Sequence, residues 1–171
     1  DHCLSRGLGD VYKRQLNEYL QFASTGAKDK TETFDISELI LKLINNYNNP
    51  NIIQNFKEEI YFNGRKNLIA RCINNLIENS LKYAKKVEIS MEKQKDNLII
   101  IVSDDGPGVP EKEHENIIKP FYKIDKSRSE SKSSVGLGLS IASDISRSHG
   151  GDIKFAKSKF GGLEVSISLP F

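Results

Sequence analysis

The sequence has few of the features that mark several specialised protein classes. It contains two cysteines in 171 residues, Cys3 and Cys72, and they are too far apart for metal-ligand spacing. This predicts two reduced thiols in a reducing compartment, with Cys72 buried on a helix. No apolar run reaches the ~18 residues that a membrane-spanning helix needs. Lysine and arginine (25) outnumber aspartate and glutamate (23) by two, and no basic block is interleaved with aromatic residues, so no nucleic-acid partner is expected.

What the chain does contain is the composition of a soluble globular domain. Hydrophobic residues make up 37% and charged residues 28%, enough for one domain with a sizeable core and a short appendage. The first 15 residues lack periodicity and differ from the Lys-, Ile- and Asn-rich remainder. They resemble the translated adapter sequence found at broken ends of environmental gene assemblies, and residues 1–15 are predicted to be a non-native or disordered segment.

The next segment, residues 16–33, is predicted to be the end of a helix and a linker. Leu16, Tyr19, Leu20 and Ala23 recur at helical spacing. The polar stretch from Ser24 to Thr33 follows, so the domain proper is expected to cover residues 34–171.

Periodicity within residues 34–171 predicts helices and strands in alternation. Asp35 can cap a helix, with Glu38 three residues later as in a capping box. The longest helical pattern runs from Gly64 to Ala84, and another from Gly136 to Ser148. Predicted strands cover residues 52–56, 59–62, 87–93, 98–103, 152–156 and 163–169, in part as two hairpins. This pattern indicates an α+β fold, a two-layer α/β sandwich with a mixed, mostly antiparallel sheet covered by helices on one face.

Polar side chains gather on one face of the longest predicted helix. Asn75 and Asn79 are four residues apart, and Lys82 and Tyr83 follow. A buried amide without partners costs about 1–3 kcal/mol, so two beside an apolar stripe are unusual. An Asn oxygen can coordinate Mg²⁺, and a lysine can reach a phosphate. The alternative is a helix whose polar side faces water.

Two Gly-containing segments could complete a nucleotide site. Asp104 follows a predicted buried strand, where a carboxylate can accept an exocyclic amine proton, and Gly106 and Gly108 would let the backbone approach a planar base. Gly136 and Gly138 lie where a loop enters a helix, whose free N–H groups suit phosphate. Taken singly, the first segment could be a plain turn and the second a packed junction.

The order and spacing of these three segments resemble the histidine kinases of two-component systems. That family belongs to the ATPase superfamily shared with type II topoisomerases, mismatch-repair ATPases and large heat-shock chaperones. The resemblance covers residues 16–171, and its nearest form is the osmosensor-type kinase. It is carried by Asn75–Tyr83 (N box), Asp104–Gly108 (first Gly box), Pro120–Tyr122 (F box), Gly136–Leu139 (second Gly box), and the tail segments Ser148–Gly151 and Gly161–Leu163.

The resemblance implies a Bergerat-type ATP-binding fold and a role for each matching residue. Asn79 would be the Mg²⁺ ligand, and Asp104 would accept the adenine amino group. An ATP lid is expected at about residues 109–135. The other implied contacts are Asn75 and Lys82 near phosphate, Tyr83 along the adenine, Gly106 and Gly108 lining the base, Lys123 and Arg128 at the γ-phosphate, Phe121 anchoring the lid, and Gly136, Leu137, Gly138 and Leu139 supporting the triphosphate.

The implied function is transfer of the γ-phosphoryl group of ATP to a histidine on a dimerisation domain missing from this chain. None of His2, His114 and His149 is expected to have the acceptor pattern, a helical His followed by an acidic residue; His114 is expected in a loop that holds only a weak helical piece near residues 114–118. The implied partners are that histidine domain and a response regulator, and the implied whole protein is a homodimer in the bacterial inner membrane with this part in the cytoplasm. The alternatives are a regulatory nucleotide-binding module, which the unusual Ser134 and Val135 favour, and an ATP-hydrolysing relative.

Overall fold

The computed structural model describes residues 29–124 and 136–171 of the chain. The predictions for residues 1–15 and 16–28, and those for Arg128, Ser134 and Val135, lie outside the described residues.

The larger of two sheets has five strands in the order β2-β4-β5-β7-β6. All neighbours are antiparallel except β2 and β4, which are parallel. This confirms the predicted mixed, mostly antiparallel sheet. The strands are β2 (Ile52–Asn55), β4 (Val87–Gln94), β5 (Asn97–Asp104), β6 (Asp152–Lys157) and β7 (Leu163–Pro170).

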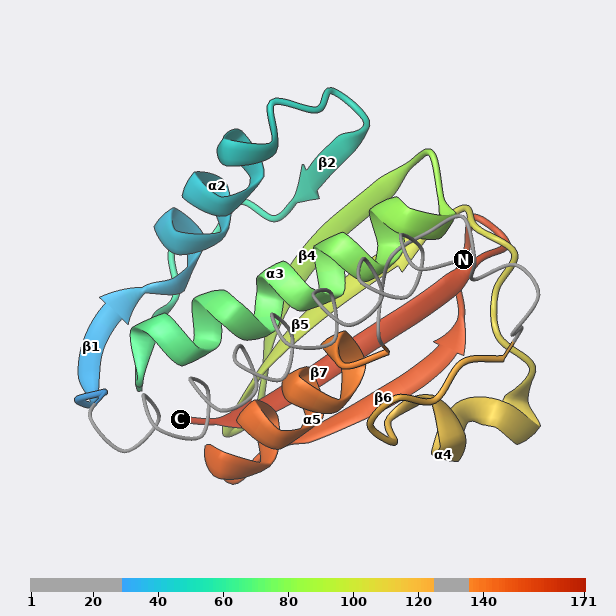
Figure 1. Cartoon of the computed structure of the whole chain (residues 1–171). Helices are drawn as coiled ribbons and strands as arrows, with labels where there is room; N and C mark the ends of the chain where they lie inside the picture. The colour runs from blue at the N-terminus through green and yellow to red at the C-terminus, as the bar shows by residue number, and fades with distance from the viewer. Residues whose placement is uncertain (1–28, 125–135) are drawn as a thin grey trace, which may run out of the picture.

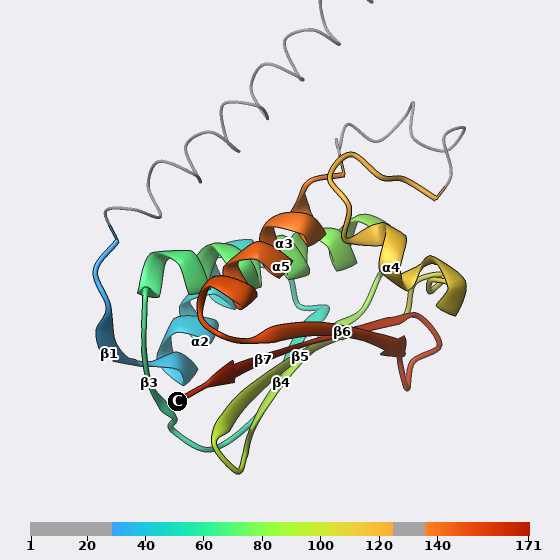
Figure 2. The same cartoon turned by 90° about the horizontal axis from the view of Figure 1, so that it is seen from below.

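Helices cover one face of this sheet, as the side view in Figure 2 shows. Helices α3 and α5 lie next to each other above the strands, and α2 lies beyond α3 toward the small sheet (Figure 1). A short 3-10 turn precedes α4 at the other end of the molecule. The helices are α2 (Ile36–Tyr47), α3 (Lys66–Tyr83), α4 (His114–Ile117) and α5 (Gly138–Ser148), with the 3-10 turn at Glu111–Glu113.

The core fills the space between the two layers. Alternating residues of β4, β5 and β7 point inward, and the apolar stripes of α3 and α5 pack onto them. Ile69, Ile73 and Ile77 of α3 are fully buried, as expected from their three- and four-residue spacing. Cys72 is also buried, as predicted, and its thiol donates to the carbonyl oxygen of Ala142 in α5 at 3.6 Å. Within the two described ranges, no helix is long and apolar enough to cross a bilayer.

The second, two-stranded sheet was not predicted. Strand β1 (Glu32–Asp35) pairs antiparallel with β3 (Tyr61–Gly64). The prediction of a linker up to Thr33 was therefore wrong at its last two residues. The strand expected at residues 59–62 lies two residues later, because the register with β1 pairs Asp35 with Tyr61 and Glu32 with Gly64. Phe62 points inward there and packs against Phe34.

The helix ends also differ from the predicted boundaries. Asp35 caps α2 through Ser37 N–H at 2.8 Å, as expected, but Glu38 pairs with Lys42 at 2.7 Å, so only half of the capping box forms. Helix α3 begins at Lys66 rather than Gly64, which is in β3, and α5 begins at Gly138 rather than Gly136, where φ is +78°. The weak helical piece expected near residues 114–118 is confirmed as α4, so His114 begins a helix and does not lie in a loop.

Candidate nucleotide-binding site

Helix α3 carries the two asparagines of the candidate site. Its apolar stripe lies against the sheet, which fixes the rotation of the helix and places Asn75 and Asn79 together, one turn apart, at the margin of the buried face. The Nδ2 of Asn75 is buried and has no hydrogen-bond partner among the described residues. A buried, unpaired amide donor is costly, so this position fits a group that accepts hydrogen bonds, such as a phosphate.

The N-terminus of α5 lies beside Asn75. A Cβ added to Gly138 would sit 3.7 Å from the Asn75 carbonyl oxygen and 3.9 Å from its Oδ1. The capping position is Leu137, which has no side chain able to satisfy the first N–H groups of the helix. Leu137 and Leu139 bury their side chains, so only their backbone is available to a ligand. This arrangement offers backbone donors and a positive helix end next to Asn75.

Asp104 ends β5 and is 3% exposed. Its Oδ1 accepts two backbone hydrogen bonds, from Gly106 N–H and Leu163 N–H, both at 2.9 Å. Its Oδ2 makes no hydrogen bond within the described residues. The carboxylate is therefore held by one oxygen and keeps the other as an acceptor, which suits an exocyclic amino group.

Two glycines bring the loop after Asp104 close to its neighbours. A Cβ on Gly106 would lie 3.2 Å from the Tyr83 carbonyl oxygen, so this loop passes directly along the end of α3. Gly108 has φ +71° and lies against the backbone of Gly162. The sequence predicted that both glycines let the backbone approach a base. In the structure they also pack against protein backbone.

The hairpin turn between β6 and β7 is part of the site in a way that the sequence did not reveal. A Cβ on Gly162 would lie 2.2 Å from Oδ1 of Asp104 and 2.5 Å from the backbone nitrogen of Gly106. Gly162 also donates its N–H to the Asp104 carbonyl at 3.2 Å. In the sequence, Gly161–Leu163 contributed to the family resemblance but carried no indication of a contact with Asp104.

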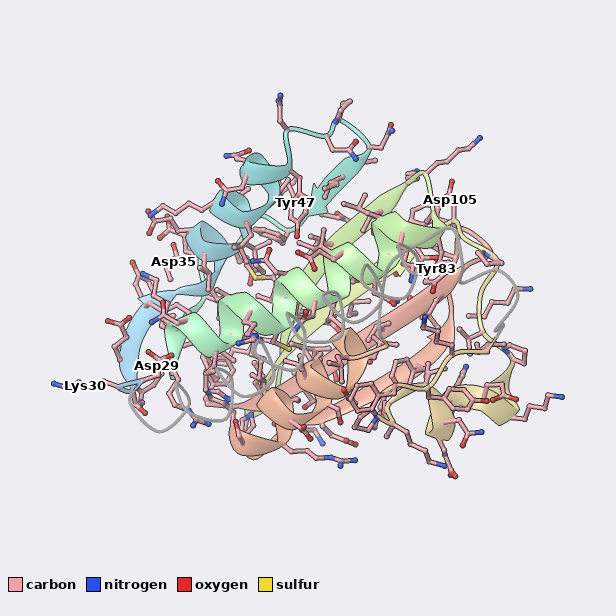
Figure 3. The ribbon with its side chains drawn as sticks, in the orientation of Figure 1. Asp29, Lys30, Asp35, Tyr47, Tyr83 and Asp105 are labelled. Carbon is pink, nitrogen blue, oxygen red and sulfur yellow. The ribbon has the colours of Figure 1, made fainter. Side chains whose placement is uncertain are left out.

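Lys82 and Tyr83 are the last two residues of α3. Tyr83 lies beside the loop that follows Asp104 (Figure 3). The Tyr83 side chain is 52% exposed, so its ring has a face available to a planar ligand. The ammonium group of Lys82 lies 4.9 Å from the centre of that ring. Asp105, which sequence reasoning passed over, accepts hydrogen bonds at 2.8 Å from the backbone N–H groups of both Lys85 and Lys86.

A backbone hydrogen bond joins Phe121 to Gly136, the first described residue after residue 124. Phe121 N–H donates to the Gly136 carbonyl oxygen at 3.0 Å. Phe121 has φ +65°, unusual for a residue with a side chain, and its ring is 54% exposed. Phe121 thus contacts Gly136 through its backbone, and its ring does not enter the core. The neighbouring Lys123 is partly exposed.

Tyr122, the residue after Phe121, is held by hydrogen bonds to the region of α4. The Tyr122 hydroxyl donates to Oε2 of Glu113 at 2.5 Å, and Nδ2 of Asn116 donates to the same oxygen at 3.2 Å. These bonds lower the pKa of the Glu113 carboxyl, and the bond to Glu113 raises the pKa of Tyr122. Both groups therefore keep their ordinary charge near neutral pH.

The two described histidines hold structural positions. His149 lies at the end of α5 with Nδ1 at 2.8 Å from the Ile145 carbonyl oxygen, while Nε2 accepts from Arg65 N–H at 3.2 Å. Because Nε2 is an acceptor, the ring is neutral, and burial lowers the pKa of His149. His114 places Nε2 3.2 Å from the Val109 carbonyl oxygen and its ring 5.7 Å from that of Phe155.

Comparison with known proteins places the sequence in one ATPase family. Residues 64–171 match the family model described as histidine kinase-, DNA gyrase B- and HSP90-like ATPase. The sensor histidine kinase GtrS of Pseudomonas aeruginosa is 39% identical over 107 residues, which cover 63% of this chain and 22% of that protein. The chain spans about a quarter of the length of the curated relatives it matches.

Solved structures share the fold. The ATP-binding domain of PrrB from Mycobacterium tuberculosis superposes with a TM-score of 0.69 at 22% identity, covering 83% of this chain and 98% of that one. Full-length ShkA in complex with AMPPNP gives a TM-score of 0.75 at 21% identity, covering 98% of this chain and 37% of that one. The chain therefore belongs to the histidine kinase-, DNA gyrase B- and HSP90-like ATPase family and carries an ATP-binding catalytic domain of the sensor histidine kinase type.

Proposed function

We propose that this domain binds Mg-ATP and donates its γ-phosphoryl group to a histidine on a separate dimerisation domain. The observation that carries the proposal is the convergence of Asn75, with its buried and unpaired Nδ2, on the uncapped N-terminus of α5 at Gly138. A triphosphate placed there would meet an amide donor and a positive helix end. The acceptor Oδ2 of Asp104 is suited to the adenine amino group.

Mg²⁺ would be held by Asn79 together with phosphate oxygens and waters. The part of the chain that the structure describes has no cluster of three His, Cys, Asp or Glu side chains able to hold a metal. A single amide oxygen from α3 is consistent with the way Mg²⁺ usually binds, through few protein ligands and a nucleotide. Lys82 would neutralise phosphate charge, and Lys123 and Arg128 would reach the γ-phosphate.

The acceptor histidine is assigned to another domain because of how the described histidines are bonded. Both ring nitrogens of His149 are engaged, one with Ile145 and one with Arg65. His114 packs against Phe155 and lies near the Val109 carbonyl. In the proposed step a free imidazole nitrogen of the separate domain bonds to the γ-phosphorus, the bond to the β–γ bridging oxygen breaks, and ADP leaves. The other ring nitrogen gives its proton to the acidic residue that follows the acceptor histidine. A response regulator would then receive the phosphoryl group.

Asn75 argues against the hydrolytic alternative, whereas the regulatory alternative has to be separated by experiment. Hydrolysis needs a base to activate water, and an amide such as Asn75 cannot take up a proton from it. A regulatory module would bind nucleotide without transfer, so only the transfer assay separates it from a kinase.

The full protein is further proposed to be a homodimer in the inner membrane, with this domain in the cytoplasm.

A nucleotide titration tests the binding half of the proposal. Calorimetric titration of ATP should show binding that strengthens with Mg²⁺ in the parent chain. Asn79→Ala should abolish that Mg²⁺ dependence, whereas Asn74→Ala, which changes the adjacent face of α3 bonded to Tyr47, should keep it. No binding to the parent chain would end the proposal.

A transfer assay tests the catalytic half. The chain is mixed with a purified dimerisation domain from a related sensor kinase and with γ-labelled ATP. Acid-labile label on the dimerisation domain is expected. A dimerisation domain whose acceptor histidine is replaced by glutamine should carry no label. Nucleotide binding without label on cognate acceptor domains would favour the regulatory module. Rapid ATP hydrolysis without an acceptor would favour the hydrolytic relative.

A further inference from the structure

Two consecutive carboxylates at the end of β5 make contacts in different parts of the fold. Asp104 is buried and bonds to Gly106 and Leu163. Asp105 is exposed, and its Oδ1 accepts the backbone N–H groups of Lys85 and Lys86, each at 2.8 Å. Asp105 also donates its own N–H to the Lys86 carbonyl at 3.2 Å. Three hydrogen bonds therefore join this one residue to the segment between α3 and β4.

That segment determines where α3 ends. Ala84 donates its N–H to the Ser80 carbonyl at 2.8 Å and closes the last turn of the helix. The residue before it is Tyr83, which is 52% exposed beside the candidate adenine position. In Figure 3 Tyr83 and Asp105 are labelled at the same end of α3. Any shift of residues 84–86 would move Tyr83 with them.

The loop that would meet the base passes along the backbone of Tyr83. A Cβ on Gly106 would lie 3.2 Å from the Tyr83 carbonyl oxygen and 3.1 Å from Oδ1 of Asp104. Asp105 is the residue between Asp104 and Gly106, so its side-chain bonds link this loop to the end of α3. The distance between the Tyr83 ring and the Asp104 carboxylate depends on that link.

We propose that Asp105 is a positioning residue of the nucleotide site, which holds the end of α3 at a fixed distance from Asp104 without itself contacting ATP. The proposal rests on the proposed ATP-binding function. Hydrogen bonds to a carboxylate are stronger than neutral ones. The same bonds lower the pKa of Asp105 below its ordinary value, so the carboxylate is ionised across the working pH range.

A positioning role and a purely electrostatic role predict opposite signs. A negative charge near a triphosphate disfavours binding, so removing it would tighten ATP binding if charge were its only effect. If the hydrogen bonds matter, loss of the acceptor must weaken binding even though the charge is also lost. Asparagine separates the two, since its Oδ1 can accept both N–H groups without any charge.

The experiment compares Asp105→Ala, Asp105→Asn and Asp96→Ala by calorimetric titration with Mg-ATP, after circular dichroism has confirmed that each is folded. Asp96 is an exposed aspartate in the turn at the far end of the β4–β5 hairpin and serves as the matched control. The Ala variant at 105 should bind about tenfold more weakly, and the Asn variant within roughly threefold of the parent chain, as expected for hydrogen bonds to a charged acceptor. Asp96→Ala should bind like the parent.

In the transfer assay, Asp105→Ala should raise KM for ATP and leave kcat within about twofold, since the phosphate contacts at α5 are untouched. A loss of stability alone would leave KM unchanged at a temperature where the variant is folded. Should the Ala variant not fold, Asp105→Leu, which is close to aspartate in size and has no hydrogen-bond acceptor, takes its place with the same expectation.

Three results would overturn the proposal. The Ala variant could bind ATP as tightly as the parent or more tightly, the Asn variant could bind as weakly as the Ala variant, or kcat could fall with KM unchanged. Failure of the parent chain to bind ATP is a separate outcome, because it removes the proposed function itself.

Discussion

Leu163 donates its backbone N–H to Oδ1 of Asp104 at 2.9 Å across 59 residues of sequence. The last hairpin of the chain thereby holds the carboxylate that is proposed to recognise adenine. Gly162, the residue before Leu163, lies so close to Asp104 that an added Cβ would be 2.2 Å from Oδ1. The β6–β7 turn therefore fixes the position of Asp104, although the turn itself is not expected to touch a nucleotide.

We expect Gly162→Ala to weaken ATP binding by about tenfold or more, because the added methyl displaces a carboxylate whose hydrogen bonds are worth roughly 1.5–3 kcal/mol each. The measurement is a calorimetric titration of the folded variant. Gly161→Ala is the matched control. Its Cβ would meet nothing within 4 Å, although φ +95° strains the backbone there, so it should lower stability and keep ATP affinity. Equal affinity in the two variants would contradict the expectation.

Asp29 is expected to stabilise the start of α3. Arg65 at the capping position makes no side-chain cap, whereas Asp29 accepts from Nδ2 of Asn67 at 2.8 Å and from Leu68 N–H at 3.3 Å. Figure 3 shows Asp29 beside that helix end and the neighbouring Lys30 pointing away. Asp29→Ala should lower the free energy of unfolding by about 1 kcal/mol, a typical value for a lost cap.

Urea unfolding provides the measurement for this cap. Lys30→Ala should leave the midpoint unchanged, and Asp29→Asn should retain part of the effect, since its amide oxygen can still accept. Identical midpoints for Asp29→Ala and Lys30→Ala would show that the cap contributes nothing.

His149 should make stability depend on pH in the weakly acidic range. Burial lowers the pKa of His149 in the folded state, against 6.5 in the unfolded chain. The unfolded state therefore binds more protons, and stability rises with pH. This contribution is fully present above about pH 6.5 and is lost as the pH falls through the lower folded pKa, since a protonated Nε2 can no longer accept from Arg65 N–H.

Urea unfolding between about pH 5 and pH 7.5 measures this slope. His149→Gln should be less stable at neutral pH and should lose stability less steeply on acidification. Asp29 lies close enough to raise the His149 pKa slightly, so Asp29→Ala should shift the transition to lower pH. A parent slope equal to that of His149→Gln would exclude the assignment.

Cys72 should not react with thiol reagents in the folded protein. Burial raises the pKa of this thiol to about 12, so at pH 8 only about one molecule in ten thousand carries the thiolate. The test uses a Cys3→Ser variant, in which Cys72 is the remaining cysteine, with maleimide labelling followed by mass spectrometry. No label is expected in buffer and full label in urea. Rapid labelling in buffer would indicate that α3 and α5 separate.

The parts of the fold that sequence predicted well are those fixed by local periodicity. The apolar stripe of α3 and the alternation of β4, β5 and β7 gave these elements to within two residues, because each residue's face depends on its near neighbours. Strand β1 was missed because its pairing with β3 joins Glu32 to Gly64, and a polar strand shows its pattern only when its partner is known.

The candidate site shows the same division. Motif spacing in the sequence was enough to name Asn75, Asn79 and Asp104 as candidates. The hydrogen bonds that hold the two aspartates join segments about 20 to 60 residues apart. Leu163 donates to Asp104, and Lys85 and Lys86 donate to Asp105. A sequence without a structure carries no register between such segments, so their support roles became visible only in three dimensions.

The sheet order has a consequence for how these molecules meet one another. Strand β4 would present a long, unpaired edge if the short parallel strand β2 did not cover it. At the opposite edge, β6 carries exposed charges at Asp152, Lys154 and Lys157. Short covering strands and charged edges both oppose strand addition between copies. Aggregation by sheet extension is thus disfavoured at both edges of the five-stranded sheet.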